Sequence, residues 1–248
     1  MNGWEEHLAR EAARYEDGES RLPEDPDARQ RQLTRMGNAA GGAGLALLMA
    51  GRGDEASDWF HRAAQRYRES IDGAPAGSWG RPIGAMKALV IRAAYAGKAG
   101  IGSVGGVASE RLGDDWPGAE AAAAARWALE LGAAEAESPI GRYAAALALL
   151  ILGDDHAAVI HADAIRNDDD FPHDVGDALA FVAAQDVVGY TYAVESVLES
   201  FEQRKEYLED LPVADTVLVL QALAARRGIA AELSSPLLPA RSGGAGTP

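Results

Sequence analysis

Three histidines and several aspartates between residues 154 and 177 are of the types that bind metal ions. Such a site needs two or three of them to converge at about 2 Å from one ion. No histidine pair has the i, i+4 spacing that, with a glutamate, marks a metalloprotease helix. We therefore expect no metal site, and we interpret the acidic run at 168–170 as a solvated connection between helices. The side chains considered are His156, His161, His173, Asp154, Asp155, Asp163, Asp168, Asp169, Asp170, Asp174 and Asp177.

A glycine-rich segment, residues 100–105, matches the pattern Gly-x-Gly-x-x-Gly. In a dinucleotide-binding fold this pattern follows a strand and opens a helix. Here the preceding segment 85–95 has a helical pattern, and Lys98 precedes the glycines instead of following them as in a phosphate-binding loop. Six glycines lie within residues 97–117, a density that a helix does not tolerate. We expect a long mobile loop over 97–117 and no cofactor.

Nucleophilic catalysis has no support in the sequence. The chain contains no cysteine, which excludes disulfides, thiolate metal sites and a cysteine nucleophile. No serine lies in a Gly-x-Ser-x-Gly elbow. Acidic residues are so abundant that a pair of carboxylates carries no information about acid–base catalysis. The sequence predicts that the protein is not an enzyme.

Two short aromatic and arginine pairs are the candidate binding residues. Trp79 and Arg81 bracket Gly80 at an expected helix start, and Arg142 and Tyr143 occupy a similar place in a second copy of the Pro-Ile-Gly sequence. Trp, Tyr and Arg are the types enriched at binding hot spots. The alternative is that Trp79 packs against the helix entry and that Arg81 pairs with local acids.

The positions of these residues depend on helices, which the hydrophobic periodicity predicts throughout. Apolar residues recur every three or four positions over 54–71, which indicates one buried stripe on an amphipathic helix. We expect Asp54 to be its N-cap. A preceding helix ends near Ala50, so residues 27–72 form a helical hairpin. Gly37, Gly41, Gly42 and Gly44 lie inside that first helix, which indicates tight helix packing because each glycine costs about 1 kcal/mol there.

The pattern of the hairpin returns later in the chain. The sequence Leu-Ala-Leu-Leu at 45–48 is repeated at 147–150, and Gly51 and Ala56 align with Gly153 and Ala158 at the same offset. A weaker copy begins at Leu179. Prolines at expected helix starts accompany these copies, because a proline costs nothing in the first helical turn. They are Pro82, Pro139, Pro172 and Pro212.

These residues resemble the tetratricopeptide repeat, a helical hairpin of about 34 residues. Gly44, Gly51, Ala56, Phe60 and Ala63 fall where that repeat places its small and aromatic residues. The copy at 146–165 has Ala162 in place of the aromatic residue, and neither copy has the Trp and Tyr signature of the first helix. The resemblance implies an all-α fold, an array of antiparallel helical hairpins that forms a degenerate, tetratricopeptide-like α-solenoid. Such arrays usually hold a protein or peptide on a concave face.

A second resemblance concerns residues 178–228. Their pattern, a stripe of Tyr190, Val194, Val197 and Phe201 followed by Leu211-Pro212 and a last helix, is similar to the closing segment of helical immunity proteins from bacterial polymorphic toxin systems. It implies an alternative function, neutralisation of a partner toxin. A third alternative is a small-ligand receptor or enzyme that uses the 97–117 loop as a lid.

Composition limits the environment and the partners. The chain has 38 acidic residues against 23 Lys and Arg, a formal charge of −15, and only three of the 23 are lysines. This balance repels nucleic acid, which basic residues must neutralise. Acid excess with few lysines resembles proteins of salt-loving organisms, where acidic side chains keep a surface hydrated; the alternative is a moderately acidic protein from a GC-rich mesophile. The N-terminus has no signal-peptide core and the apolar stretch 144–152 is too short to span a bilayer, so we expect a cytoplasmic protein without membrane contact.

Taken together, the sequence predicts one helical repeat domain over residues 1–233 and a disordered tail over 234–248. The expected function is that of a non-enzymatic interaction or scaffold protein in a halophilic organism, with a protein or peptide as its unknown partner.

Overall fold

The protein is all-helical over the part of the chain that the computed structural model describes, residues 3–71, 74, 77–96 and 118–240, where ten α-helices and no strands are found. The predicted loop at 97–117, including the Gly-x-Gly-x-x-Gly segment, lies outside the described residues. The helices are α1 (Gly3–Ser20), α2 (Pro26–Met49), α3 (Gly53–Glu69), α4 (Gly80–Tyr95), α5 (Gly118–Glu130), α6 (Pro139–Leu152), α7 (Asp155–Arg166), α8 (His173–Ala184), α9 (Val187–Glu202) and α10 (Asp215–Arg226).

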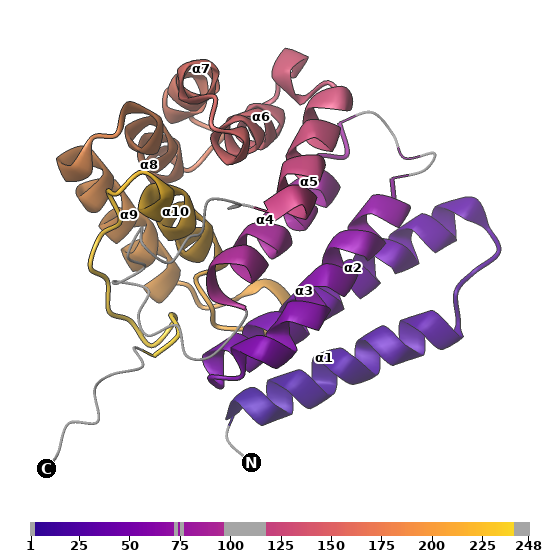
Figure 1. Ribbon diagram of the computed structural model, residues 1–248. Helices are drawn as coiled ribbons and strands as arrows, with labels where there is room; N and C mark the ends of the chain where they lie inside the picture. The colour runs from indigo at the N-terminus through magenta and orange to yellow at the C-terminus, as the bar shows by residue number, and fades with distance from the viewer. Residues whose placement is uncertain (1–2, 72–73, 75–76, 97–117, 241–248) are drawn as a thin grey trace, which may run out of the picture.

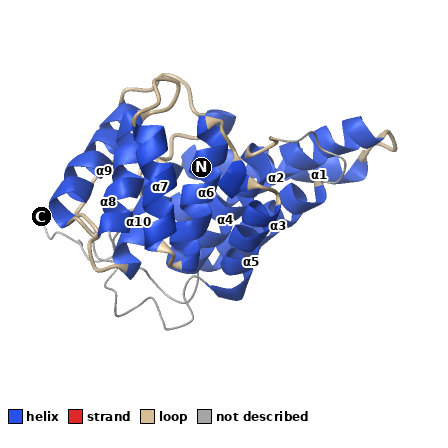
Figure 2. Cartoon of the chain, turned by 90° about the horizontal axis from the view of Figure 1, so that it is seen from above, coloured by secondary structure: helices blue, strands red, loops and turns tan. Residues whose placement is uncertain are grey.

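Helices α1 to α9 form a two-layered array in which each helix packs against its neighbours in the sequence. Helices α2, α4, α6 and α8 also contact one another in turn, so they form the inner layer. Helices α3, α5, α7 and α9 cover that layer from outside. Seen from above in Figure 2, the array runs from α1 and α2 at one end to α8 and α9 at the other. This arrangement confirms the predicted all-α array of helical hairpins.

Helix α10 departs from the pattern because it does not extend the array. It folds back against α4, α8 and α9 on the inner side of the curve (Figure 1), and every residue from Val217 to Ala225 is buried. The face that such arrays usually present to a partner is therefore filled by the chain itself. This differs from the open concave face that the sequence led us to expect, because eight of the nine residues from 217 to 225 are small or apolar and the ninth, Gln221, is buried with hydrogen-bond partners.

Hydrogen bonds between distant helices hold α10 in place. The Tyr95 hydroxyl donates to the Leu218 carbonyl oxygen at 3.0 Å, and the Tyr190 hydroxyl donates to Gln221 Oε1 at 2.7 Å. Arg226 and Arg227 donate to the carbonyl oxygens of Ile151 and Leu150 at 2.9 and 3.0 Å. Arg226 gives a partner to the Ile151 carbonyl near the end of α6, and Arg227 adds a second one to the Leu150 carbonyl, which also accepts from the Gly153 N–H.

The repeated sequence pattern corresponds to repeated local structure. Gly51 and Gly153 both have a positive φ, 76° and 82°, directly after the first helix of a hairpin. Asp154 and Asp186 are the N-caps of α7 and α9, where their carboxylates accept hydrogen bonds from backbone N–H groups. The expected hairpin at 27–72 is thus confirmed as α2 and α3.

The glycines inside α2 make room for aromatic rings of α3. A Cβ atom at Gly37 would lie 2.9 Å from the Tyr67 ring, and one at Gly44 would lie 2.9 Å from the Phe60 ring. Gly84 of α4 also faces the Tyr67 ring, and a Cβ atom at position 84 would lie 2.7 Å from it. The predicted tight packing is confirmed for Gly37 and Gly44, since both ring positions leave no space for a methyl group.

Two expectations about boundaries need correction. Asp54 is not the N-cap of α3: the helix begins at Gly53 with Arg52 as its N-cap residue, and Asp54 makes no capping hydrogen bond. The packed part of the chain also extends beyond residue 233. Leu237 and Leu238 are buried, and the Ala214 N–H donates to the Leu237 carbonyl oxygen at 3.0 Å, so the first residues of the predicted tail join the core. Residues 241–248 lie outside the described part.

Candidate functional site

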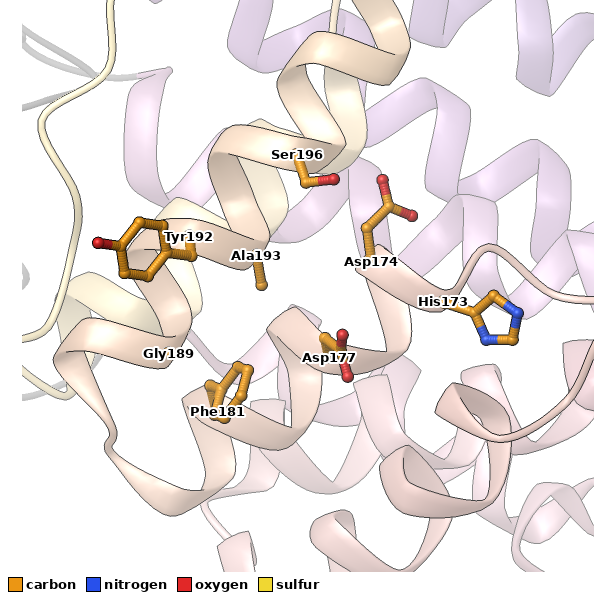
Figure 3. Close-up of a pocket in the computed structure, with 8 residues that line it drawn as sticks. All are labelled: His173, Asp174, Asp177, Phe181, Gly189, Tyr192, Ala193 and Ser196. Atoms are coloured by element: carbon orange, nitrogen blue, oxygen red, sulfur yellow. The ribbon is translucent and has the colours of Figure 1, made fainter.

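A groove of 610 Å³ lies between helices α8 and α9. Its α8 side is formed by His173, Asp174, Asp177 and Phe181, and its α9 side by Gly189, Tyr192, Ala193 and Ser196. In Figure 3 the acidic side chains of α8 lie opposite Ser196 and Ala193 of α9. The volume is in the range of ordinary ligand sites, about 300–1,000 Å³.

The close approach of the two helices defines the narrow end of the groove. Gly189, in the first turn of α9, lies directly against Phe181: a Cβ atom at position 189 would be 2.5 Å from the ring. The Arg166 guanidinium of α7 lies 5.2 Å from the centre of the same ring. Phe181 is therefore held between a glycine and an arginine, and it forms an apolar floor.

The two carboxylates of the groove differ in their partners. Asp177 accepts a hydrogen bond from Arg166 Nε at 2.6 Å. The Asp174 carboxylate accepts one from its neighbouring backbone N–H, that of Val175, at 3.0 Å. Within the described part of the chain, no lysine or arginine lies within ion-pair distance of Asp174. One wall of the groove thus carries a negative charge without a cation.

Large apolar side chains are exposed beside the groove. Tyr192, on its rim, is 73% exposed, and Val187 and Val188 at the start of α9 are 52% and 66% exposed. Exposed apolar residues that lie together, unlike scattered ones, mark interaction sites. The sequence analysis identified the buried stripe of α9, which is confirmed, but missed this second pair, Val188 and Tyr192. Their i, i+4 spacing on the face opposite a complete buried stripe is the signal that could have revealed them.

The residues predicted to bind a partner face different neighbours. Trp79 is 8% exposed and lies against Gly141, and Tyr143 is 7% exposed with its ring 5.5 Å from that of Phe171. Both belong to the core, which fits the packing alternative for Trp79. Neither side chain can reach a partner while the protein is folded.

The two arginines of that prediction have different neighbours in the array. Arg81 of α4 donates from Nε to the Thr34 hydroxyl of α2 at 3.2 Å, its Nη1 is buried without a hydrogen bond, and burial lowers its pKa. Arg142 of α6 donates to the Glu137 carbonyl oxygen at 3.2 Å and faces His161 of α7. These two side chains do not form a common surface.

A second group of polar side chains, which the sequence did not predict, lies partly buried where α10 begins. Lys87 of α4 pairs with Asp215 at 2.5 Å and donates to the Thr216 hydroxyl at 3.2 Å. Nearby, the Tyr67 hydroxyl donates to Asn38 Oδ1 at 2.8 Å, and Asn38 Nδ2 donates to Glu209 Oε1 at 3.1 Å. A Lys and an Asp that are 128 positions apart carry no local signal, so only the fold brings them together.

The pKa values in this group oppose acid–base catalysis. Burial alone would lower the pKa of Lys87, but the adjacent Asp215 carboxylate outweighs burial and the pKa is raised. Burial raises the pKa of both Tyr67 and Tyr143. A general base or acid works best with a pKa near the operating pH, whereas these groups are moved away from it. The Lys87–Asp215 ion pair joins α4 to the start of α10.

No metal or membrane feature is found in the residues that the structure describes. No group of three or more histidines, aspartates or glutamates is arranged to hold an ion, and no helix is long and apolar enough to cross a bilayer. The dense histidines and aspartates of α7 and α8 are instead spread along the surface; His173, for example, donates from Nδ1 to the Arg166 carbonyl oxygen at 2.8 Å.

Comparison with known proteins adds no assignment: no family model, no curated protein sequence and no solved structure matches this chain.

Proposed function

We propose that the protein is a non-enzymatic interaction protein that binds a partner polypeptide through the groove between α8 and α9. The observation that carries this proposal is the exposure of Tyr192, which lines the groove beside an apolar floor, and of Val188, one turn earlier on α9. Water-exposed apolar area of this kind gains free energy when a partner covers it, about 25 cal/mol per Å².

The proposal moves the binding site from the inner face of the array to the groove between α8 and α9. Helix α10 fills the inner face. Moving it away would expose its own buried side chains, among them Val217 and Leu218, and the core against which they pack. A partner could not replace α10 without unfolding the protein. The groove between α8 and α9 needs no such rearrangement.

The absence of enzymatic activity remains part of the proposal. It is supported by the pKa directions at Lys87, Tyr67 and Tyr143, which keep these groups in their resting protonation states at neutral pH. The cytoplasm of a halophilic organism, as expected from composition, stays the proposed location.

Affinity capture with matched variants tests this function. The full-length protein is immobilised and exposed to lysate of the organism that encodes it, and bound proteins are identified by mass spectrometry. The groove variant is Val188→Ser with Tyr192→Ser. The control is Ile140→Ser, which removes another exposed apolar side chain, 43% exposed, at the start of α6.

We expect a partner that wild type and the control retain and that the groove variant loses. The identified partner, once purified, must then bind wild type in calorimetry with the same dependence on the groove. Retention by the groove variant contradicts the proposed site. Turnover of a substrate that Lys87→Met abolishes in a folded protein contradicts the absence of enzymatic activity.

A further inference from the structure

The negative charge of the protein is concentrated around the groove. Residues 154–203, which span α7, α8 and α9, contain twelve acidic residues and a single arginine, Arg166. Their formal charge of −11 accounts for most of the −15 of the whole chain. Residues 1–96, by contrast, contain 14 acidic and 13 basic residues. We call residues 154–203 the acidic block and residues 1–96 the N-terminal block.

The cation inside the acidic block is already engaged. Arg166 pairs with Asp177 at 2.6 Å and with Asp163 at 3.3 Å, and it lies over the Phe181 ring. Arg227 of α10 pairs with Asp155 from the inner side. In the described part of the chain, no other lysine or arginine pairs with an acid of the block. Asp174 and the aspartates at 168–170 therefore have no lysine or arginine partner there.

Apolar exposure coincides with this charge. Six large apolar side chains are at least 40% exposed in the described residues, and four of them belong to the acidic block. They are Ile160, Val187, Val188 and Tyr192. An acidic wall at Asp174 beside an apolar floor at Phe181 and Ala193 is complementary to a segment that carries both a cation and an apolar side chain.

We propose that the groove binds a polypeptide segment in which a lysine or arginine lies next to an apolar side chain. The cation pairs with Asp174, and the apolar side chain packs on Phe181 and Ala193, with Tyr192 covering it from the rim. Charge complementarity speeds encounter and selects the partner, while the apolar contact supplies affinity. This inference rests on the proposed function, because it specifies the chemistry of the partner for the same groove.

The charge of the block argues against two other classes of partner. Nucleic acid phosphates and anionic lipid surfaces are both repelled by a formal charge of −11. A small ligand would leave Val187 and Val188 uncovered, since they lie at the start of α9 and do not line the groove. A polypeptide segment can occupy the groove and extend along α9 over Val188, one turn before Tyr192.

Three synthetic peptides of equal length, with leucines at the same positions, serve as probes. Their polar positions carry arginine in the first peptide, glutamine in the second and glutamate in the third. Binding of each labelled peptide to the full-length protein is followed by fluorescence anisotropy at low and at molar salt. The variants are Asp174→Asn, which keeps the shape and removes the charge, and Tyr192→Ser. The control is Asp58→Asn, the same chemical change at an exposed position of α3. Circular dichroism checks that each variant is folded.

We expect the arginine peptide to bind most tightly and the glutamate peptide least. Asp174→Asn should weaken the arginine peptide about two- to fivefold at low salt and leave the glutamine peptide unchanged, because one partly exposed ion pair is lost. Tyr192→Ser should weaken the binding of both the arginine peptide and the glutamine peptide. Asp58→Asn should change neither, and the effect of Asp174→Asn should shrink at molar salt, where charges are screened within about 3 Å.

Each other outcome has a distinct meaning. If all three peptides bind equally and Tyr192→Ser weakens all of them, the cationic partner is overturned while the docking groove stands. If the arginine peptide binds and neither groove variant weakens it, the site assignment in this inference is overturned. If no peptide binds wild type, a cation beside an apolar side chain is not sufficient, and the inference falls independently of the capture experiment.

Discussion

The N-terminal block and the acidic block are built from the same kind of helical hairpin, yet they treat their charged groups in opposite ways. In the N-terminal block, arginines find carboxylates on neighbouring helices: Arg66 of α3, for example, pairs with Glu19 of α1 at 2.5 Å and with Glu69 at 2.7 Å. Even the buried Glu11 is paired, with Arg10 and Arg14 at 2.8 Å each. In the acidic block, most carboxylates have no basic partner in the described residues.

The packing of the two blocks differs in the same direction. The aromatic residues of α3, Phe60 and Tyr67, are inserted into glycine positions of α2 and are 1% and 8% exposed. On α9, Tyr192 is 73% exposed at the edge of a groove. In the N-terminal block, then, several carboxylates pair with arginines and the rings of α3 are enclosed, whereas the acidic block has few such pairs and leaves the Tyr192 ring exposed.

Removing an aromatic side chain should change the stability of the protein very differently in the two blocks. Phe60→Ala should lower the free energy of unfolding by about 3–5 kcal/mol, because it leaves a cavity in the core. Tyr192→Ala should change it by no more than about 0.5 kcal/mol, because the side chain is exposed. Urea denaturation followed by circular dichroism measures both. An equal loss in the two variants would show that Tyr192 is a core residue and not a binding residue.

Two glycines of α2 provide a matched pair inside the N-terminal block. Gly44→Ala should destabilise the protein, because the new methyl group meets the buried Phe60 ring and overpacking costs about 1–3 kcal/mol. Gly41→Ala should stabilise it by up to about 1 kcal/mol, since the nearest atom is 4.0 Å away and alanine favours the helix. Thermal unfolding of the two variants should therefore shift in opposite directions. Shifts of the same sign would mean that the α2–α3 interface can relax around a methyl group.

The link between the two ends of the molecule is tested at Glu209. This residue has φ of 56°, and its side chain accepts hydrogen bonds from Arg14 and Asn38 of α1 and α2. Glu209→Ala should lower the free energy of unfolding by about 1 kcal/mol, a modest value because Arg14 is 43% exposed and water screens the pair. In hydrogen-exchange measurements on this variant, the backbone amides of α1 should show most of the increase in exchange rate. Faster exchange in α8 and α9 instead would place the affected contacts in the acidic block.

Removing single charges should have opposite effects on stability in the two blocks. Arg66→Gln should lower the free energy of unfolding by about 0.5–1 kcal/mol, because it breaks ion pairs with Glu19 and Glu69. Asp168→Asn should raise it at low salt, because it relieves repulsion from neighbouring aspartates and an amide oxygen can still accept the Asp170 N–H. At about 1 M salt both effects should fade. A loss of stability in Asp168→Asn would indicate a cation partner for that carboxylate.

The smallest expected effect concerns the pH dependence of stability. His161 of α7 has a lowered pKa, through burial and then through Arg142, which Glu135 partly offsets; burial also lowers the pKa of His7 in α1. The unfolded chain therefore binds protons more readily than the folded one as pH falls through the ordinary histidine value of 6.5, so the free energy of unfolding should decrease there.

Variants assign this effect to each block. His161→Gln and His7→Gln should each flatten part of the pH dependence in urea denaturation between about pH 5 and 8. Arg142→Gln should flatten only the part that belongs to His161, because it removes a nearby positive charge. A steeper dependence in Arg142→Gln would mean that Arg142 does not repel the protonated imidazole.

Much of the architecture was predictable from local sequence. The stripe over 54–71, the turn at Gly51 with its copy at Gly153, and the buried stripe of α9 all follow from rules that act within a few residues. The glycines at 37 and 44 also indicated close packing, although not the identity of the rings that fill them. The predicted N-cap at Asp54 was wrong by two positions: α3 begins at Gly53, and Arg52, which binds Glu5 and Glu55, is its N-cap residue.

The candidate site was less predictable than the fold. The sequence pointed to Trp79 and Tyr143, since their types are common at interfaces, but burial is a property of the whole fold and both are in the core. Tyr192 was missed for the same reason, because an aromatic residue next to a buried stripe does not show which way it faces. The acidic residues of α7 and α8 were visible, while the lack of a cation near Asp174 was not.

The order, length and turns of the helices were determined by the sequence alone, because helix propensity, periodicity, glycine conformation and capping act between residues close in the chain. The tertiary fold was needed to place α10 on the inner face and to bring Asp155 to Arg227, while Asp174 meets no arginine among the described residues. The physical reason is that ion pairing and burial depend on which surfaces meet in space. These contacts join residues as distant in sequence as Lys87 and Asp215, and no rule that acts between neighbouring residues predicts such a pair.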